Sequence, residues 1–312
     1  MTKPAVYGAI DLGTNSFRLL IAALSPAGTL QALLAKELVT VRLGQGMETS
    51  GQLSPAAMER GRKALARFAL LLAAHQPKRL RVCGTHALRT ATNSATFLHD
   101  AAAILGQVIE TISGEEEAAL ALAGASHCFA PSAALVLADV GGGSSELVWQ
   151  GGSMSVPLGA VTLTERFLPS GSAPDSSTLD TLRATIAEVL LAKRQASSGR
   201  PPANCILVGS GGTATALAAL DLGLAVYDEN RVQGHRLALP RLRELIGELA
   251  RLDAMHRNQL PGLDQGRGEI ILAGALIYEQ LLMLLGHERF TVSDAGLLEG
   301  ILLSTAPECA AQ

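Results

Sequence analysis

The feature of this sequence that most constrains its fold is an internal repeat. The segment from Asp11 to Leu20 aligns without gaps on the segment from Asp139 to Val148. In each copy an apolar run leads into the aspartate, and a second run follows a glycine and a serine, so we expect a strand, a tight turn and a returning strand. The residues shared by the two copies are Asp11/Asp139, Gly13/Gly141, Ser16/Ser144 and Leu19/Leu147. A repeated unit of this kind predicts two related α/β lobes that face a cleft.

The sequence around each copy alternates between strand and helix patterns. A further strand at about 30–43 would continue an antiparallel meander, and Ser54 and Pro55 match the N-cap and first residue of a helix. Other strands are expected at 79–83, 108–112, 134–138, 205–208 and 290–293, and helices at 93–105, 114–125, 178–195 and 269–285. We predict two domains, residues 1–123 and 124–312, with the closing helix a candidate to pack back onto the first.

Composition excludes several classes of protein. Hydrophobic residues make up 48% of the 312 residues, which is enough for two cores and excludes a disordered chain. Lys and Arg number 25 against 28 Asp and Glu, so the chain lacks the basic excess of proteins that bind nucleic acid or anionic lipid. Aromatic residues make up only 3%, so few rings are present to stack on the bases of single-stranded nucleic acid. A polyanionic ligand would therefore be held by a local site.

Cysteine usage and the apolar segments indicate a cytoplasmic protein without a membrane partner. The four cysteines form no CxxC pair, which argues against a zinc site or a disulfide framework: they are Cys83, Cys128, Cys205 and Cys309. Asp11 interrupts the first apolar run, so a secretory signal is not expected. The apolar helix at 269–285 contains Glu279 and Gln280 and is expected to be a core helix.

The turn in each copy has the composition of a phosphate site. Glycine lets backbone N–H groups approach an anion, and neighbouring hydroxyl and amide side chains add donors. A third glycine-rich turn follows the strand at 205–208. One copy alone could equally be an ordinary hairpin turn, but three favour phosphate binding. The expected phosphate-binding residues are Gly13, Thr14, Asn15, Ser16, Gly141, Gly142, Gly143, Ser144, Gly209, Ser210 and Gly211.

Three acidic residues near these turns are candidate metal ligands. Asp11 and Asp139 end apolar strands, and Mg²⁺ is a hard cation that prefers carboxylate and phosphate oxygens. Glu146 stands where the first copy has Arg18, and a hairpin would bring it beside Asp139. The competing interpretation of Glu146 is a solvent-facing strand residue. We expect Asp139 and Glu146 to hold Mg²⁺ or another divalent cation, with Asp11 as an outer-shell partner.

Glu117 is a candidate general base. It closes an acidic run at 115–117 that opens a helix, where negative charge complements the helix dipole. Ser113 and Glu116 fit a capping box, which explains Glu116 and leaves Glu117 without a structural task. A carboxylate near bound phosphate can accept a proton from an attacking water.

Two arginines could contact phosphate. Arg89 lies just after the strand at 79–83, and its forked cation would stabilise a phosphoryl group during transfer. Arg267 lies between two glycines in an expected loop, from which it could reach a phosphate or a nucleotide. An ordinary surface position is the competing interpretation of each.

The motifs occur in one order along nearly the whole chain, at residues 11–16, 84–89, 113–118, 139–146, 209–213, 260–263 and 293–300. Together they resemble the exopolyphosphatase/guanosine pentaphosphate phosphohydrolase (Ppx/GppA) family. The resemblance implies an α/β fold of two actin-like (duplicated ribonuclease-H-like) domains with an interdomain cleft. It also implies removal of the terminal phosphate of inorganic polyphosphate or of guanosine pentaphosphate, a nucleotide of the stringent response.

The resemblance also assigns roles to individual residues. Glu117 matches the family's catalytic base, Asp139 and Glu146 its metal-binding acids, and Arg89 its phosphate-contacting arginine. Longer members carry further helical domains after the actin-like pair, whereas this chain ends at Gln312. Processivity on long polymers, the choice between the two substrates, the preferred metal and the oligomeric state, a homodimer included, are left open.

Two other functions are also left open. An actin-like kinase would need an adenine pocket and an aspartate that binds the acceptor, and the sequence has no clear acceptor motif. A non-catalytic sensor would bind guanosine polyphosphates without hydrolysing them. The presence of Glu117, Asp139 and Glu146 disfavours the sensor.

Overall fold

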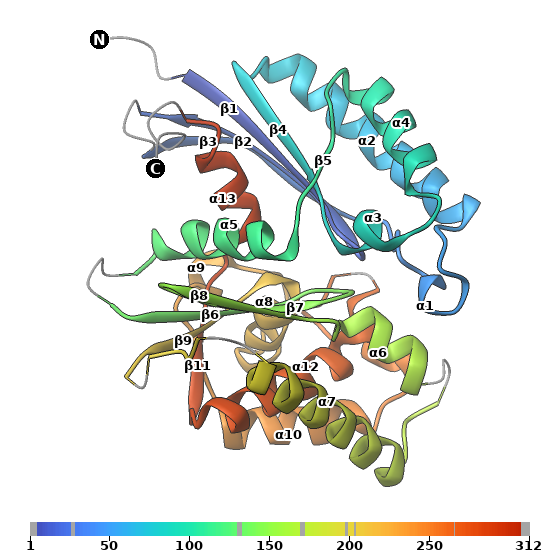
Figure 1. Ribbon diagram of the computed structural model, residues 1–312, viewed down its shortest axis with the longest axis vertical. Coiled ribbons are helices and arrows are strands. Elements are labelled where there is room, and N and C mark those ends of the chain that lie inside the picture. Colours follow the sequence, from blue (N-terminus) through green and yellow to red (C-terminus); the bar gives the residue numbers. More distant parts are fainter. Residues whose placement is uncertain are drawn as a thin grey trace. The chain divides into compact units, whose positions relative to one another are not determined.

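The computed structural model describes residues 5–25, 29–129, 133–168, 172–196, 199–202, 204–264 and 266–306 (Figure 1). Cys309 and Gln312 lie outside these ranges. The chain divides into two compact units. Unit 1 comprises Met1–Gly124 and Gly296–Gln312, and unit 2 comprises Ala125–Ala295.

Unit 1 is built on a five-stranded sheet in the order β3-β2-β1-β4-β5. The strands β1 (Ala5–Leu12), β2 (Ser16–Leu24) and β3 (Leu30–Thr40) form an antiparallel meander, as predicted. β4 (Arg79–Gly84) runs parallel to β1, and β5 (Glu110–Thr111) runs parallel to β4. The strand expected at 108–112 is therefore shorter than its apolar pattern indicated. Because β2 is buried along most of its length, its sequence is a nearly continuous apolar run.

The helices in the described residues of unit 1 are α1 (Met47–Ser50), α2 (Pro55–His75), α3 (His86–Thr90), α4 (Ser94–Leu105), α5 (Gly114–Ser126) and α13 (Leu297–Leu303). The predicted start of α2 is confirmed, because the hydroxyl of Ser54 accepts a hydrogen bond from the N–H of Ala57. The closing helix α13 packs on β1, β2 and β4 of this unit (Figure 1). Arg81 on β4 supports this packing through a 2.9 Å hydrogen bond from Nη1 to the hydroxyl of Ser304.

Unit 2 contains a six-stranded sheet in the order β10-β11-β9-β6-β7-β8. The strands β6 (Leu135–Val140), β7 (Ser145–Trp149) and β8 (Gly152–Val156) form a second antiparallel meander. β9 (Ile206–Ser210) and β11 (Arg289–Val292) continue the sheet in parallel, and β10 (Arg236–Ala238) pairs antiparallel with β11. The order β8-β7-β6-β9-β11 repeats the order of unit 1, which confirms the predicted duplication.

The helices of unit 2 are α6 (Ala160–Phe167), α7 (Ser176–Ala196), α8 (Gly211–Asp221), α9 (Glu229–Val232), α10 (Leu239–Ala250), α11 (Ala254–Arg257) and α12 (Arg267–Leu285). Among the described residues, α12 is the one helix long and apolar enough to cross a membrane, and 78% of that stretch is buried inside the structure. It packs against α6, α7, α8 and α10, as expected of a core helix.

Candidate active site

The two repeated turns share one hydrogen-bonded geometry. The N–H of Gly13 donates to the carbonyl of Ser16 at 3.2 Å, and that of Gly141 donates to the carbonyl of Ser144 at 3.0 Å. A Cβ on either glycine would lie 2.9 Å from that carbonyl oxygen, closer than real Cβ atoms come. Neither glycine has a positive φ. Close backbone approach therefore explains both glycines.

The turn of unit 1 is held by the loop that follows β3. The carbonyl of Asn15 accepts hydrogen bonds from the N–H groups of Val41 and Arg42, at 3.0 and 2.7 Å, and the carbonyl of Thr14 accepts one from Gly44 at 2.9 Å. The side chains of the turn are buried, and the amide of Asn15 donates to the hydroxyl of Ser16 at 3.3 Å. The polar groups expected to bind phosphate are thus fixed by backbone contacts.

Arg89 and Glu117 form an ion pair in unit 1. Nη1 of Arg89 lies 3.2 Å from Oε2 of Glu117 and donates to the carbonyl of Ile112 at 2.7 Å. The two side chains are 25% and 14% exposed, so the pair is mostly shielded from solvent but still accessible. Arg89 follows β4 and belongs to the short helix α3.

Glu116, the neighbour of Glu117, has a structural task, as predicted. The hydroxyl of Ser113 accepts a hydrogen bond from its N–H at 3.1 Å. Its carboxylate bonds to Nη2 of Arg81 at 2.5 Å instead of reaching back to the N-cap, so only half of the expected capping box forms.

His86 lies near Arg89. Its pKa is lowered by burial and, to a smaller extent, by the charge of that arginine.

The two acidic candidates of unit 2 lie directly opposite each other. Asp139 on β6 pairs with Glu146 on β7, which puts both side chains on one face of the sheet. Glu146 is 2% exposed, so its interpretation as a solvent-facing residue is wrong. Its Oε1 accepts a hydrogen bond from the hydroxyl of Ser155 on β8 at 3.0 Å. Ser155 was not predicted as a site residue, because the strand β8 that carries it was not predicted.

The third turn joins β9 to α8 and lies against Asp139. Ser210 is fully buried, does not cap α8, and its Oγ has no hydrogen-bond partner among the described residues. Gly211 has a φ of 79°, and a Cβ there would collide with Oδ1 of Asp139. A helix N-terminus without a side-chain cap, next to an unsatisfied hydroxyl, is an arrangement suited to binding a phosphate.

Arg267 adds a cation at the same helix terminus. A Cβ on Gly212 would collide with its guanidinium, so this group lies over the first turn of α8. The expected loop position is wrong, because Arg267 is the first residue of α12 and is only 7% exposed. Gly209, on β9, packs closely on Phe290: a Cβ there would lie 2.6 Å from the ring.

The residues of unit 2 fit a magnesium ion with few protein ligands. The described part of the chain contains no group of three or more His, Cys, Asp and Glu residues placed to hold a metal. Asp139 and Glu146 supply two hard carboxylates on one face, and Mg²⁺ usually completes its shell with water and phosphate oxygens. Asp11 occupies the equivalent position of unit 1, on β1 opposite Arg18.

Comparisons with known proteins cover nearly the whole chain. The model of the Ppx/GppA phosphatase family matches residues 21–309. The Mycobacterium tuberculosis protein named exopolyphosphatase 2 is 35% identical over 323 residues, covering 96% of this chain and 98% of its own length. Relatives of this kind therefore have nearly the same length as this chain.

Solved structures of exopolyphosphatases and other Ppx/GppA proteins also match nearly the whole chain. The crystal structure of an exopolyphosphatase-like protein matches with a TM-score of 0.92 at 29% identity, covering 99% of this chain and 100% of its own. An exopolyphosphatase from Cytophaga hutchinsonii matches with a TM-score of 0.86 at 25% identity, over 97% and 98%. The Ppx/GppA family member of Aquifex aeolicus gives 0.80 at 27% identity, over the same shares.

Proposed function

Since this chain belongs to the Ppx/GppA phosphatase family and has its two actin-like, duplicated ribonuclease-H-like domains, we propose that it is an exopolyphosphatase, which hydrolyses the terminal phosphoanhydride bond of inorganic polyphosphate. The observation that carries the proposal is the 3.2 Å ion pair between Arg89 and Glu117. Guanosine pentaphosphate ends in the same kind of bond and is the second substrate to be tested. No described residue identifies a guanine pocket.

In the proposed reaction Glu117 accepts a proton from a water molecule. The water oxygen bonds to the terminal phosphorus while the bridging P–O bond breaks, and the electron pair of that bond leaves with the shortened chain. The products are inorganic phosphate and a polyphosphate one unit shorter. Arg89, held by the carbonyl of Ile112, offsets negative charge on the terminal phosphoryl group. Because phosphoryl transfer has a loose transition state, positioning and charge supply most of the rate.

Unit 2 is assigned the binding of phosphate and cation. Asp139 and Glu146 would hold a divalent cation, which when bound neutralises phosphate oxygens. Arg267, the hydroxyl of Ser210 and the uncapped amides of α8 would bind phosphate groups, as would the residues of the turn from Gly141 to Ser144. In unit 1 the turn from Gly13 to Ser16 is likewise assigned the binding of phosphate.

The experiment that tests this proposal measures released phosphate. The purified protein is given short polyphosphate, long polyphosphate or guanosine pentaphosphate at matched concentration, with and without Mg²⁺. We expect Glu117→Gln to lower the rate by about 10²–10⁴-fold, the range of general-base catalysis. Glu115→Gln is the matched control, because Glu115 lies in the same acidic run and is exposed; its rate should equal that of the wild type.

Two results would replace the proposal. Tight binding of guanosine pentaphosphate without phosphate release, with Mg²⁺ present, would indicate a sensor. Transfer of phosphate from ATP to a hydroxylated small molecule, without hydrolysis of polyphosphate, would indicate a kinase.

A further inference from the structure

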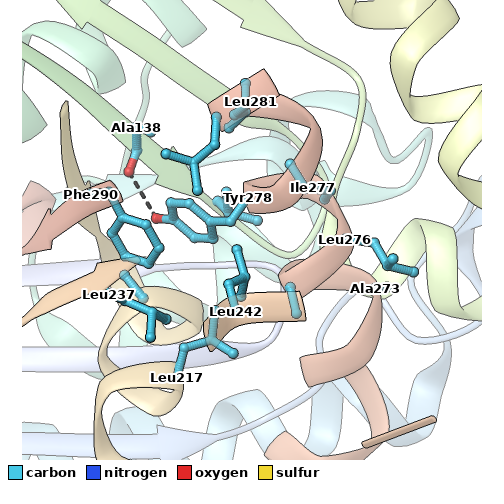
Figure 2. Close-up of a cluster of buried hydrophobic side chains, with 14 of the residues drawn as sticks. Ala138, Leu217, Leu237, Leu242, Ala273, Leu276, Ile277, Tyr278, Leu281 and Phe290 are labelled. Carbon is cyan, nitrogen blue, oxygen red and sulfur yellow. Dashed lines mark hydrogen bonds between the residues drawn. The ribbon is translucent and has the colours of Figure 1, made fainter. Parts of the chain in front are cut away.

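The hydroxyl of Tyr278 joins the ends of two neighbouring strands of unit 2. Its oxygen lies 2.9 Å from the carbonyl oxygen of Ala138 and 3.0 Å from that of Ser210. Ala138 directly precedes Asp139, and Ser210 is the last residue of β9. Figure 2 shows the phenol directed at Ala138 from α12, with the ring of Phe290 beside it. The side chain of Tyr278 thus contacts two backbone carbonyls. One directly precedes Asp139, a proposed cation ligand, and the other belongs to Ser210, a proposed phosphate ligand.

The surroundings of Tyr278 leave its ring little freedom. It is completely buried and stacks on Phe290, with ring centroids 4.6 Å apart and an interplanar angle of 15°. Burial, and then the negative charge of Asp139, raises its pKa well above the ordinary value. The phenol therefore stays protonated, and the two carbonyls share its single O–H proton.

The carbonyl on the other side of Asp139 is also held by a side chain. The hydroxyl of Thr213 donates to the carbonyl of Val140 at 3.2 Å. Thr213 fits there because residue 274 of α12 is glycine: a Cβ on Gly274 would lie 2.5 Å from the methyl group of Thr213. Gly274 and Tyr278 are four residues apart and so share one face of α12. That face therefore supports the backbone both before and after Asp139.

These contacts act where the regular sheet stops. The parallel pairing of β6 with β9 ends at the pair Asp139–Ser210. Beyond it β6 enters the turn at Gly141, and β9 enters α8. At this point the carboxylate of Asp139 occupies the space that a Cβ on Gly211 would need. The spacing of the two chain segments there depends on side-chain hydrogen bonds such as those of Tyr278.

We propose that Tyr278 is a positioning residue, which fixes the carboxylate of Asp139 relative to the turn at Ser210 and Gly211 and so sets the affinity of unit 2 for a divalent cation. The inference rests on the proposed function, which assigns Asp139 to that cation. Mg²⁺ tolerates little departure from octahedral geometry, so a small displacement of one carboxylate weakens its binding. Groups that orient metal ligands typically contribute about 10–100-fold to metal affinity.

The test is Tyr278→Phe, which keeps the ring and its stacking and removes only the hydroxyl. Binding of Mn²⁺, a paramagnetic substitute for Mg²⁺, is titrated by electron paramagnetic resonance on the protein without substrate. We expect the dissociation constant to rise by about 10-fold, and the Mg²⁺ concentration that gives half-maximal phosphate release to rise by a similar factor. In an Asp139→Asn background the same substitution should have little further effect.

Tyr7→Phe is the matched control, since Tyr7 is a buried tyrosine of unit 1. It should leave Mn²⁺ affinity unchanged. Thr213→Val, which keeps the shape of the side chain and removes its hydroxyl, is the second variant if Tyr278→Phe does not fold, and it should also weaken Mn²⁺ binding.

Wild-type Mn²⁺ affinity in Tyr278→Phe, with only a lower melting temperature, would overturn the positioning role. If the wild-type protein binds Mn²⁺ but releases no phosphate, the proposed function is refuted. The positioning role of Tyr278 is still tested in that case, because the Mn²⁺ titration does not depend on activity. A wild type that binds no Mn²⁺ would contradict the positioning role as well.

Discussion

Gly211→Ala tests the contact between the third turn and Asp139. The substitution has two effects, and the structure allows them to be separated. Gly211 has a φ of 79°, where an alanine costs about 1–2 kcal/mol relative to an ordinary conformation. The new Cβ would also collide with Oδ1 of Asp139, so the carboxylate must move by about 1 Å to restore ordinary contact.

Gly234→Ala isolates the first effect. Gly234 has a φ of 80° in the same unit, and a Cβ there would meet no atom of the described residues within 4 Å. We expect Gly234→Ala to lower the free energy of unfolding by about 1–2 kcal/mol and to leave phosphate release unchanged under conditions where the protein is folded. Gly211→Ala should lose more stability than this control. The rate of phosphate release by Gly211→Ala should also fall by about 100-fold, which is the typical effect when a residue of the active site is misplaced by about 1 Å.

The assay compares urea denaturation and phosphate release for the two variants. If both lose the same stability and both keep wild-type activity, then the contact of Asp139 with Gly211 has no functional consequence, and the assignment of Asp139 fails.

Two further predictions concern the support of Glu146 and the response to pH. Ser155→Ala removes the hydroxyl that donates to Glu146, so the Mg²⁺ concentration for half-maximal phosphate release should rise several-fold; no change would show that this hydrogen bond does not orient Glu146. The pKa of His86 is lowered by burial and then by Arg89, and that of His287 by burial. Below about pH 6.5 the unfolded chain therefore binds more protons than the folded one, so the free energy of unfolding should be greatest above that pH and fall as the pH is lowered. Urea denaturation at successive pH values measures this, and His287→Gln should flatten the decline; an equally steep decline in that variant would contradict the reasoning.

The central strands of both units could be predicted from the repeat. Their apolar runs and the turn residues between them are local signals in the sequence. The two meanders, the capped start of α2 and the buried helix α12 all follow from patterns within one segment. Elements with weak patterns were missed. β8 begins with a glycine and contains two serines, and α3 has only five residues. Neither provides enough residues for a periodic pattern to be distinguished from a loop.

The site was predictable in its residue types but not in its contacts. The motif glycines and acids indicated phosphate and metal chemistry, yet the pairing of Arg89 with Glu117 joins residues 28 positions apart and depends on how α3 and α5 pack. Tyr278 is one of three tyrosines in the chain and lies in an apolar helix. A buried tyrosine needs a partner for its hydroxyl, but the helix pattern does not say which one.

The most direct test of the central claim is the fate of solvent oxygen. The protein is incubated with polyphosphate and Mg²⁺ in water enriched in ¹⁸O, and the released phosphate is analysed by mass spectrometry. We predict one solvent oxygen in each released phosphate, and loss of this release in Glu117→Gln but not in Glu115→Gln. Release of unlabelled phosphate, or an undiminished rate in Glu117→Gln, would contradict attack by a water molecule that Glu117 deprotonates.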